Sequence, residues 1–262
     1  MAKVHGRPVW FELATSKDNL DAAGDFYARV IGWQIGDSGM EGFAYRLASA
    51  DGGMVAGLME MPGDMAGMPP AWTIYLGVDD ADRAASDIKA AGGRVFREPA
   101  DIPGTGRFAV AADPQGAPFG ILAPLPMEDG AGGDAFDQRR AGHGNWIELM
   151  STNPGAGFDF YAGLFGWRKS TAMDMGAMGT YQLFSHDGAD IGGMMGLGQA
   201  PQPCWLAYFG VNGINPALQR IRDAGGTVQH GPTEVPGGAH IAVAADPQGA
   251  WFALVGPLEE TP

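Results

Sequence analysis

The sequence has little cysteine, few basic residues and no long apolar run, and each shortage excludes a class of protein. Its 262 residues include one cysteine, Cys204, which excludes an intrachain disulfide framework and a Cys-rich zinc site. Lys and Arg number 16 against 30 Asp and Glu, for a net charge of −14. A field of that sign repels phosphate backbones and anionic lipids. Neither nucleic acid nor a membrane surface is therefore an expected partner.

Export signals and membrane spans are also missing from the pattern. No apolar run approaches the ~18 residues that cross a bilayer. The N-terminal segment MAKVHGRPVWFELATSKD lacks the apolar core of a signal peptide. We expect a cytoplasmic protein that binds a small molecule, as a monomer or a homodimer.

What the sequence does have is a duplication. The segment AVAADPQGA at residues 109–117 returns unchanged at 242–250. Three further segments have counterparts in the same order: 9–34 with 145–168, 45–59 with 181–195, and 70–78 with 203–211. A repeat of this length is a duplicated domain and not a solenoid unit.

The boundaries of the two copies follow from this alignment. We expect one domain at 6–126 and a second at 143–258, joined by a Gly-rich polar linker at 127–142. Each copy is predicted to be strand, helix and three strands, and then the same again, which is an α+β pattern.

Local signals place most of these elements in the first copy. Apolar residues recur at helical spacing over Leu20–Ile31, and Gly32 ends that helix. Asp80 is expected to cap a second helix over 81–91. Short apolar segments predict strands at 9–14, 43–49, 54–59, 72–78, 108–112 and 119–123.

Two kinds of marker recur in both copies and together resemble a known family. A helix that ends in Phe-Tyr is followed by Gly-Trp, at Phe26-Tyr27 with Gly32-Trp33 and at Phe160-Tyr161 with Gly166-Trp167. A turn Asp-Pro-Gln-Gly stands at 113–116 and at 246–249. These markers, in this order, resemble the vicinal oxygen chelate superfamily, which includes glyoxalase I, extradiol dioxygenases and bleomycin and fosfomycin resistance proteins. The resemblance implies two tandem domains, each of paired βαβββ modules that form a curved, cupped eight-stranded mixed sheet.

The resemblance also implies a metal position with one ligand from each of four strands, and this chain departs from that pattern. The first ligand position carries Glu12 in one copy and Glu148 in the other. The other three positions carry Gly57, Thr73 and Gly120, and Gly193, Leu206 and Ala253. The side chains of Gly, Ala and Leu have no atom that can bind a metal ion, and Thr is a poor ligand for a transition metal. We therefore predict no metal site and no cofactor.

Other side chains are expected to line the cups around the two acids. Strand alternation places aromatic rings on the predicted cup faces, namely Trp10, Tyr75, Trp146, Tyr208 and Trp251. Arg107 and His240 follow Gly-rich loops at equivalent positions and are candidate ligand contacts. The alternatives are ordinary core packing for the rings, structural bonding for the acids and a solvated loop for Arg107.

The sequence is compatible with three functions. The leading hypothesis is a metal-independent small-molecule-binding protein, similar in mode to the bleomycin-resistance branch. The alternative is a glyoxalase-like lyase or isomerase in which Glu12 or Glu148 is the general acid or base, the only case in which a divalent metal enters. The third is a scaffold with filled cavities. The second copy carries Trp251 where the first has Pro118, and we expect its site to bind more tightly.

Overall fold

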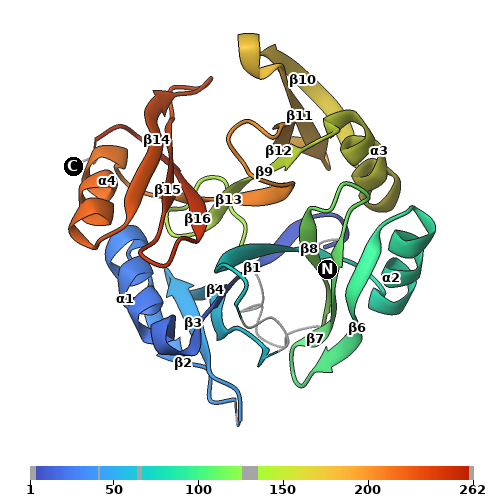
Figure 1. The fold of residues 1–262 in the computed structure, drawn as a ribbon, viewed down its shortest axis with the longest axis horizontal. Helices are drawn as coiled ribbons and strands as arrows, with labels where there is room; N and C mark the ends of the chain where they lie inside the picture. The colour runs from blue at the N-terminus through green and yellow to red at the C-terminus, as the bar shows by residue number, and fades with distance from the viewer. Residues whose placement is uncertain (1–3, 41, 64–66, 126–134, 260–262) are drawn as a thin grey trace. The chain divides into compact units, whose positions relative to one another are not determined.

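The computed structural model describes residues 4–40, 42–63, 67–125 and 135–259 (Figure 1). The first copy forms β1 (Pro8–Thr15), α1 (Leu20–Ile31), β2 (Gln34–Asp37), β3 (Tyr45–Ala50), β4 (Gly53–Glu60), β5 (Ala71–Gly77), α2 (Ala81–Ala90), β6 (Arg94–Ile102), β7 (Gly106–Ala112) and β8 (Pro118–Pro124). The second copy forms β9 (Gly144–Ser151), α3 (Pro154–Phe165), β10 (Arg168–Asp174), β11 (Thr180–His186), β12 (Ala189–Gly196), β13 (Cys204–Gly210), α4 (Ile214–Asp223), β14 (Thr227–Glu234), β15 (His240–Ala245) and β16 (Trp251–Gly256). Two 3-10 turns, η1 (Lys17–Asn19) and η3 (Gly176–Met178), complete the described elements. No helix in the described part is both long and apolar enough to span a membrane.

Each copy contributes one eight-stranded mixed sheet, which confirms the predicted α+β architecture. The strand orders are β2-β3-β4-β1-β5-β8-β7-β6 and β10-β11-β12-β9-β13-β16-β15-β14. Strands β1 and β4 pair in parallel, as do β5 and β8, whereas the hairpins that flank them are antiparallel. The second sheet repeats these pairings.

The sequence patterns that predict helices in the first copy agree with the structure, whereas two edge strands have no such pattern. Helix α1 has the predicted bounds, and Gly32 ends it with φ 94°, a left-handed conformation that glycine adopts without steric cost. The side chain of Asp80 accepts a hydrogen bond from the backbone of Arg83 and caps α2. The residues of strands β2 and β6 do not predict them, because most of their side chains are exposed and show no apolar alternation.

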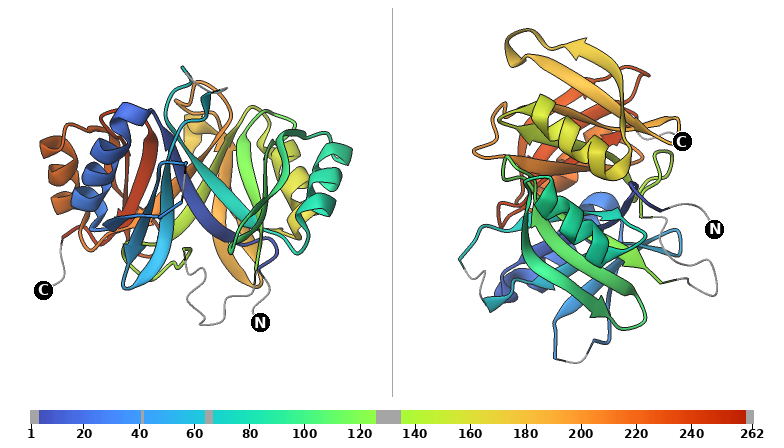
Figure 2. Two further views of the ribbon diagram at one scale, coloured as in Figure 1. Left: turned by 90° about the horizontal axis from the view of Figure 1, so that it is seen from below. Right: turned by 90° about the vertical axis from the view of Figure 1, so that its right-hand side faces the viewer.

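Contacts divide the chain into two compact units, and each unit combines parts of both copies. Unit 1 comprises the described parts of Met1–Val9, Thr73–Glu128 and Ile147–Leu206, and unit 2 those of Trp10–Trp72, Asp129–Trp146 and Ala207–Pro262. Helices α2 and α3 lie side by side in unit 1, and α1 and α4 lie side by side in unit 2 (Figure 2). The units therefore do not coincide with the two copies of the sequence.

A hydrogen-bonded chain of buried side chains links the two copies inside unit 2. The indole of Trp72 donates to the Tyr27 hydroxyl at 2.9 Å, and that hydroxyl donates to the Asp246 carboxylate at 3.1 Å. The other oxygen of Asp246 accepts from the backbone amides of Gln248 and Ala250. The Asp-Pro-Gln-Gly turn of the second copy is thereby joined to the helix of the first.

Unit 1 contains the reciprocal chain. Trp205 donates to the Tyr161 hydroxyl at 2.9 Å, which donates to Asp113 at 3.3 Å. The two Gly-Trp corners are reciprocal as well, because Trp33 donates to the carbonyl of Gly142 and Trp167 to that of Gly6. Both corner tryptophans are 3% exposed, which confirms that they belong to the core.

Candidate functional site

The first acid lies in a polar and aromatic cluster of unit 2, built on β1 and β3. The indole nitrogen of Trp10 donates to the Tyr45 hydroxyl at 3.0 Å, and Tyr45 donates to the carboxylate of Glu12 at 3.0 Å. Burial, and then the negative charge of Glu12, raise the pKa of Tyr45 well above its ordinary value of 10.0. The phenol therefore stays protonated and acts as a donor to Glu12 across the physiological range. Trp10 and Glu12 are both half-buried.

Tyr45 also explains why position 57 is glycine. Glu12 and Gly57 are partners in the parallel β1–β4 register, so the two predicted ligand positions are neighbours. A Cβ atom added to Gly57 would overlap the ring and hydroxyl of Tyr45. The tyrosine ring thus fills the space that a metal-ligating side chain on β4 would need.

The same arrangement recurs twice in unit 1. A Cβ atom on Gly193 would overlap the ring of Tyr181, and one on Gly120 would overlap the ring of Tyr75. Sequence reasoning missed Tyr45 and Tyr181 as site residues. The signal was present, because a tyrosine opens the duplicated segment at 45 and at 181 ahead of a glycine at the second ligand position.

The second acid, Glu148, is more buried than the first. It is 7% exposed on β9, where it pairs in register with Gly193 of β12. Burial and the charge of Glu148 raise the pKa of the Cys204 thiol to about 11. Cys204 therefore lies within electrostatic range of this carboxylate, and its thiol stays protonated at neutral pH.

Arg107 and Tyr75, the remaining candidates of the first copy, belong to unit 1. The guanidinium of Arg107 bonds Asp82 at 2.7 Å and Asp101 at 2.8 Å, so a ligand anion would compete with two aspartates for it. Tyr75 is 5% exposed, and its ring lies 6.4 Å from that of Phe108. Their roles as ligand contacts stay predictions.

The remaining candidates of the second copy belong to unit 2, whereas Glu148 belongs to unit 1. Tyr208 is 5% exposed and pairs in register with Ala253. Trp146 is half-buried, and Trp251 at the start of β16 is 36% exposed. His240 opens β15 opposite Gly256. The structure thus places Trp10 and Glu12 in unit 2 and the other candidates of the first copy in unit 1. Among the candidates of the second copy, only Glu148 belongs to unit 1.

The residues at the family's metal position do not fit a transition-metal ion. Each copy supplies one carboxylate, and tyrosine rings fill the space above all three glycines at the other positions. Within the described ranges, no three His, Cys, Asp or Glu side chains are grouped closely enough to hold a metal. Catalytic zinc sites use three protein ligands, so this donor set falls short.

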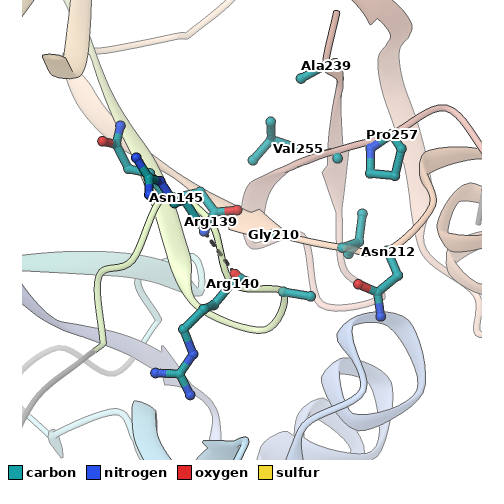
Figure 3. Close-up of a pocket in the computed structure, with 12 residues that line it drawn as sticks. Arg139, Arg140, Asn145, Gly210, Asn212, Ala239, Val255 and Pro257 are labelled. Atoms are coloured by element: carbon teal, nitrogen blue, oxygen red, sulfur yellow. Dashed lines mark hydrogen bonds between the residues drawn. The ribbon is translucent and has the colours of Figure 1, made fainter. Parts of the chain in front are cut away.

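A separate hollow of about 570 Å³ lies in unit 2 (Figure 3). Its lining comes from the segment before β9 and the start of that strand, from the ends of β13 and β16, and from Ala239, and it includes Arg139, Arg140 and Asn145. The amide of Asn145 donates to the carbonyl of Arg140 at 3.0 Å and so holds this wall in place. None of the predicted site residues lines this hollow.

Comparisons with known proteins agree with the duplicated fold. The model of the Glyoxalase/Bleomycin resistance protein/Dioxygenase superfamily matches residues 12–121 and 144–254. The anthracycline biosynthesis protein DnrV of Streptomyces peucetius is 34% identical over 268 residues, which cover 95% of this chain and 93% of the relative. The putative glyoxylase CFP32 of Mycobacterium bovis is 31% identical, with coverage of 97% and 96%.

Among solved structures, the Mn(II)-bound glyoxalase of Novosphingobium aromaticivorans has a TM-score of 0.66 at 19% identity. The match covers 98% of this chain and 84% of that structure, and it supports the fold alone. The family model covers both copies and the relatives span nearly the whole chain. The chain belongs to the Glyoxalase/Bleomycin resistance protein/Dioxygenase superfamily.

Proposed function

We propose that this protein binds a planar, partly apolar small molecule without a metal ion, with a hydrogen-bond donor of that molecule on Glu12 or Glu148. The observation that carries the proposal is the cluster of Trp10, Tyr45 and Glu12. It sets a carboxylate among aromatic rings, while the ring of Tyr45 fills the place of a metal ligand. Apolar surface with a few placed polar groups is the usual composition of a small-molecule site.

The relatives support a polycyclic aromatic ligand. DnrV is named for anthracycline biosynthesis, and the chain aligns with it along 95% of its length. Anthracyclines and their precursors are flat fused-ring polyketides that carry hydroxyl groups. Stacking of one such ring on an aromatic side chain contributes roughly 0.5–1.5 kcal/mol beyond the buried area, and a hydroxyl supplies the donor for a carboxylate.

Titration with quinizarin, a dihydroxyanthraquinone, tests the proposal. Quenching of tryptophan fluorescence would report binding to the wild type, to Glu12→Gln and to Glu148→Gln, each with and without a metal chelator. We expect unchanged binding in chelator. We expect Glu148→Gln to lose more affinity for quinizarin than Glu12→Gln. Glu148 is the more buried acid, and a hydrogen bond to a desolvated charge is stronger than one to a solvated charge. Equal loss from both variants, loss from neither, or loss in chelator would contradict the assignment.

A second candidate function is a glyoxalase-like lyase or isomerase. It is favoured by the relative named a putative glyoxylase, which is 31% identical. Glu12 or Glu148 would then move the proton, as carboxylates do in general acid–base catalysis. Turnover of a hemithioacetal by the purified protein, lost in one of the two Glu→Gln variants, would establish this activity.

A further inference from the structure

The strongest unassigned feature of the molecule is the tyrosine that lies against each acid-bearing strand pair. Tyr45 contacts Glu12 through its hydroxyl and overlies Gly57 with its ring. The two residues below it, Glu12 and Gly57, are register partners and correspond to the first two ligand positions of the family. A phenol hydroxyl therefore stands beside the remaining carboxylate where a metal-binding relative would place a ligand side chain.

Two further observations indicate a ligand-facing role and not simple core packing. Tyr45 is only half-buried, unlike the core tyrosine Tyr27, which is 0% exposed. The ring of Phe43 stacks on Tyr45 at 6.0 Å and 28° and is itself 38% exposed. An aromatic face thus continues from the acid toward solvent, which is the surface that a flat ligand would use.

The second copy repeats the steric part of this arrangement. Tyr181 overlies Gly193, the register partner of Glu148, and it too is half-buried. Outside the unchanged segments the two copies differ at many positions, yet both keep a tyrosine over a glycine beside the acid. Two occurrences of one steric arrangement make an accidental contact a poor explanation.

We infer that Tyr45 and Tyr181 are positioning residues of the proposed site, which orient Glu12 and Glu148 to accept a hydrogen bond from a phenolic hydroxyl of the ligand. This inference rests on the proposed function and names its ligand class as hydroxylated planar aromatics. Tyr45 itself shows the geometry, because its own phenol meets the carboxylate at 3.0 Å. An ionised carboxylate has about four lone-pair sites, so a ligand phenol can join it without displacing Tyr45.

The experiment compares quinizarin with unsubstituted anthraquinone, which lacks the hydroxyl groups. Binding of both probes is measured for the wild type, Tyr45→Phe, Glu12→Gln and the double variant, and in parallel for Tyr181→Phe with Glu148→Gln. Phenylalanine keeps the ring over the glycine and removes only the hydroxyl. The matched control is Ser49→Ala, which removes a hydroxyl from the same strand whose bond goes to the carbonyl of Gln34.

The expected result is a selective effect. Tyr45→Phe or Tyr181→Phe should weaken the binding of quinizarin roughly fivefold to tenfold, the scale of one ordinary hydrogen bond, and leave the binding of anthraquinone unchanged. In the Glu→Gln background the same change should have at most about a twofold effect, because residues that act through one group are not additive. Should Tyr45→Phe fail to fold, the parallel series with Tyr181→Phe carries the test, because Tyr181 overlies Gly193 as Tyr45 overlies Gly57.

The two proposals fail in different ways. In one case the wild type binds quinizarin, a Glu→Gln variant binds it more weakly, and both Tyr→Phe variants bind it as tightly as the wild type. The positioning role is then wrong and the proposed function stands. A loss of the same size for both probes, or in Ser49→Ala, also overturns the positioning role. If the wild type binds neither probe, or neither Glu→Gln variant matters, the proposed function fails and the inference fails with it.

Discussion

The hydroxyl of Tyr27 donates to the carboxylate of Asp246, and the two residues belong to different copies of the duplicated sequence. Tyr161 and Asp113 form the reciprocal bond. Each compact unit is therefore held by a bond between copies, and the sequence markers of the family are the two ends of that bond. This explains why the Phe-Tyr helix end and the Asp-Pro-Gln-Gly turn occur together in both copies.

The first prediction concerns the stability that this bond provides. Tyr27→Phe leaves the indole of Trp72 without its acceptor and removes the hydroxyl that donates to one carboxylate oxygen of Asp246, both inside the core. A buried group left without a partner costs about 1–3 kcal/mol, so we expect a loss of about 2–4 kcal/mol in the free energy of unfolding. Urea denaturation followed by circular dichroism measures it. Tyr161→Phe should lower the free energy of unfolding by a similar amount. The control Ser86→Ala, which removes an exposed hydroxyl, should change the midpoint of urea denaturation little.

The second prediction follows from the buried aspartates. Burial raises the pKa of Asp113 and Asp246 above the ordinary value of 3.8, against the hydrogen bonds that each carboxyl receives. Just above pH 3.8 the folded state consequently holds more protons than the unfolded chain. The stability that the two raised pKa values contribute is therefore complete below pH 3.8. It is lost as the pH rises through the raised pKa of each aspartate.

Denaturation of the wild type and of the Asp113→Asn/Asp246→Asn variant, at steps over roughly pH 4 to 7, isolates this contribution. The difference in unfolding free energy between the two proteins should shift in favour of the variant as pH rises. A difference that is constant with pH would show that the two carboxyls titrate alike in the folded and unfolded states.

The third prediction tests the packing of tyrosine on glycine. Gly57→Ala should lower the free energy of unfolding by about 1–3 kcal/mol, because the added methyl group overlaps Tyr45 and overpacked sites cost that much. Gly193→Ala should act in the same way through Tyr181. Gly36→Ala is the matched control, since a Cβ there meets no atom within 4 Å. Thermal denaturation of the three variants checks this, and equal midpoints for Gly57→Ala, Gly193→Ala and Gly36→Ala would contradict the steric account.

Local patterns in the sequence predicted the elements but not the contacts between copies. The helix Leu20–Ile31 and the duplicated architecture follow from periodicity and from repeated markers, which are properties of neighbouring residues. The bond from Tyr27 to Asp246 joins positions 219 apart in the chain, and no short-range pattern encodes it. The position of Tyr45 over Gly57 depends on which residues of β3 and β4 are paired, and on a side-chain direction that only the folded sheet determines.

The last prediction uses Cys204, the single cysteine of the chain, as a reporter of the second acid. Burial first, and the charge of Glu148 second, raise the pKa of its thiol from 9.0 to about 11. Since the thiolate is the species that reacts, alkylation by iodoacetamide should be slow near neutral pH and still accelerate above pH 9.0. Removal of the charge in Glu148→Gln should shift the midpoint of the rate profile to lower pH.

That midpoint should nevertheless stay above 9.0, because burial is the larger cause and persists in the variant. Mass spectrometry of the alkylated protein gives the rate at each pH, and Glu12→Gln serves as the matched control because Glu12 is not among the groups that shift this thiol. If both variants change the profile equally, or if Glu148→Gln leaves it unchanged, Glu148 does not act on the thiol. A shift confined to Glu148→Gln establishes the carboxylate beside Cys204 without reference to any ligand, and quinizarin bound at Glu148 should then slow alkylation of the wild type.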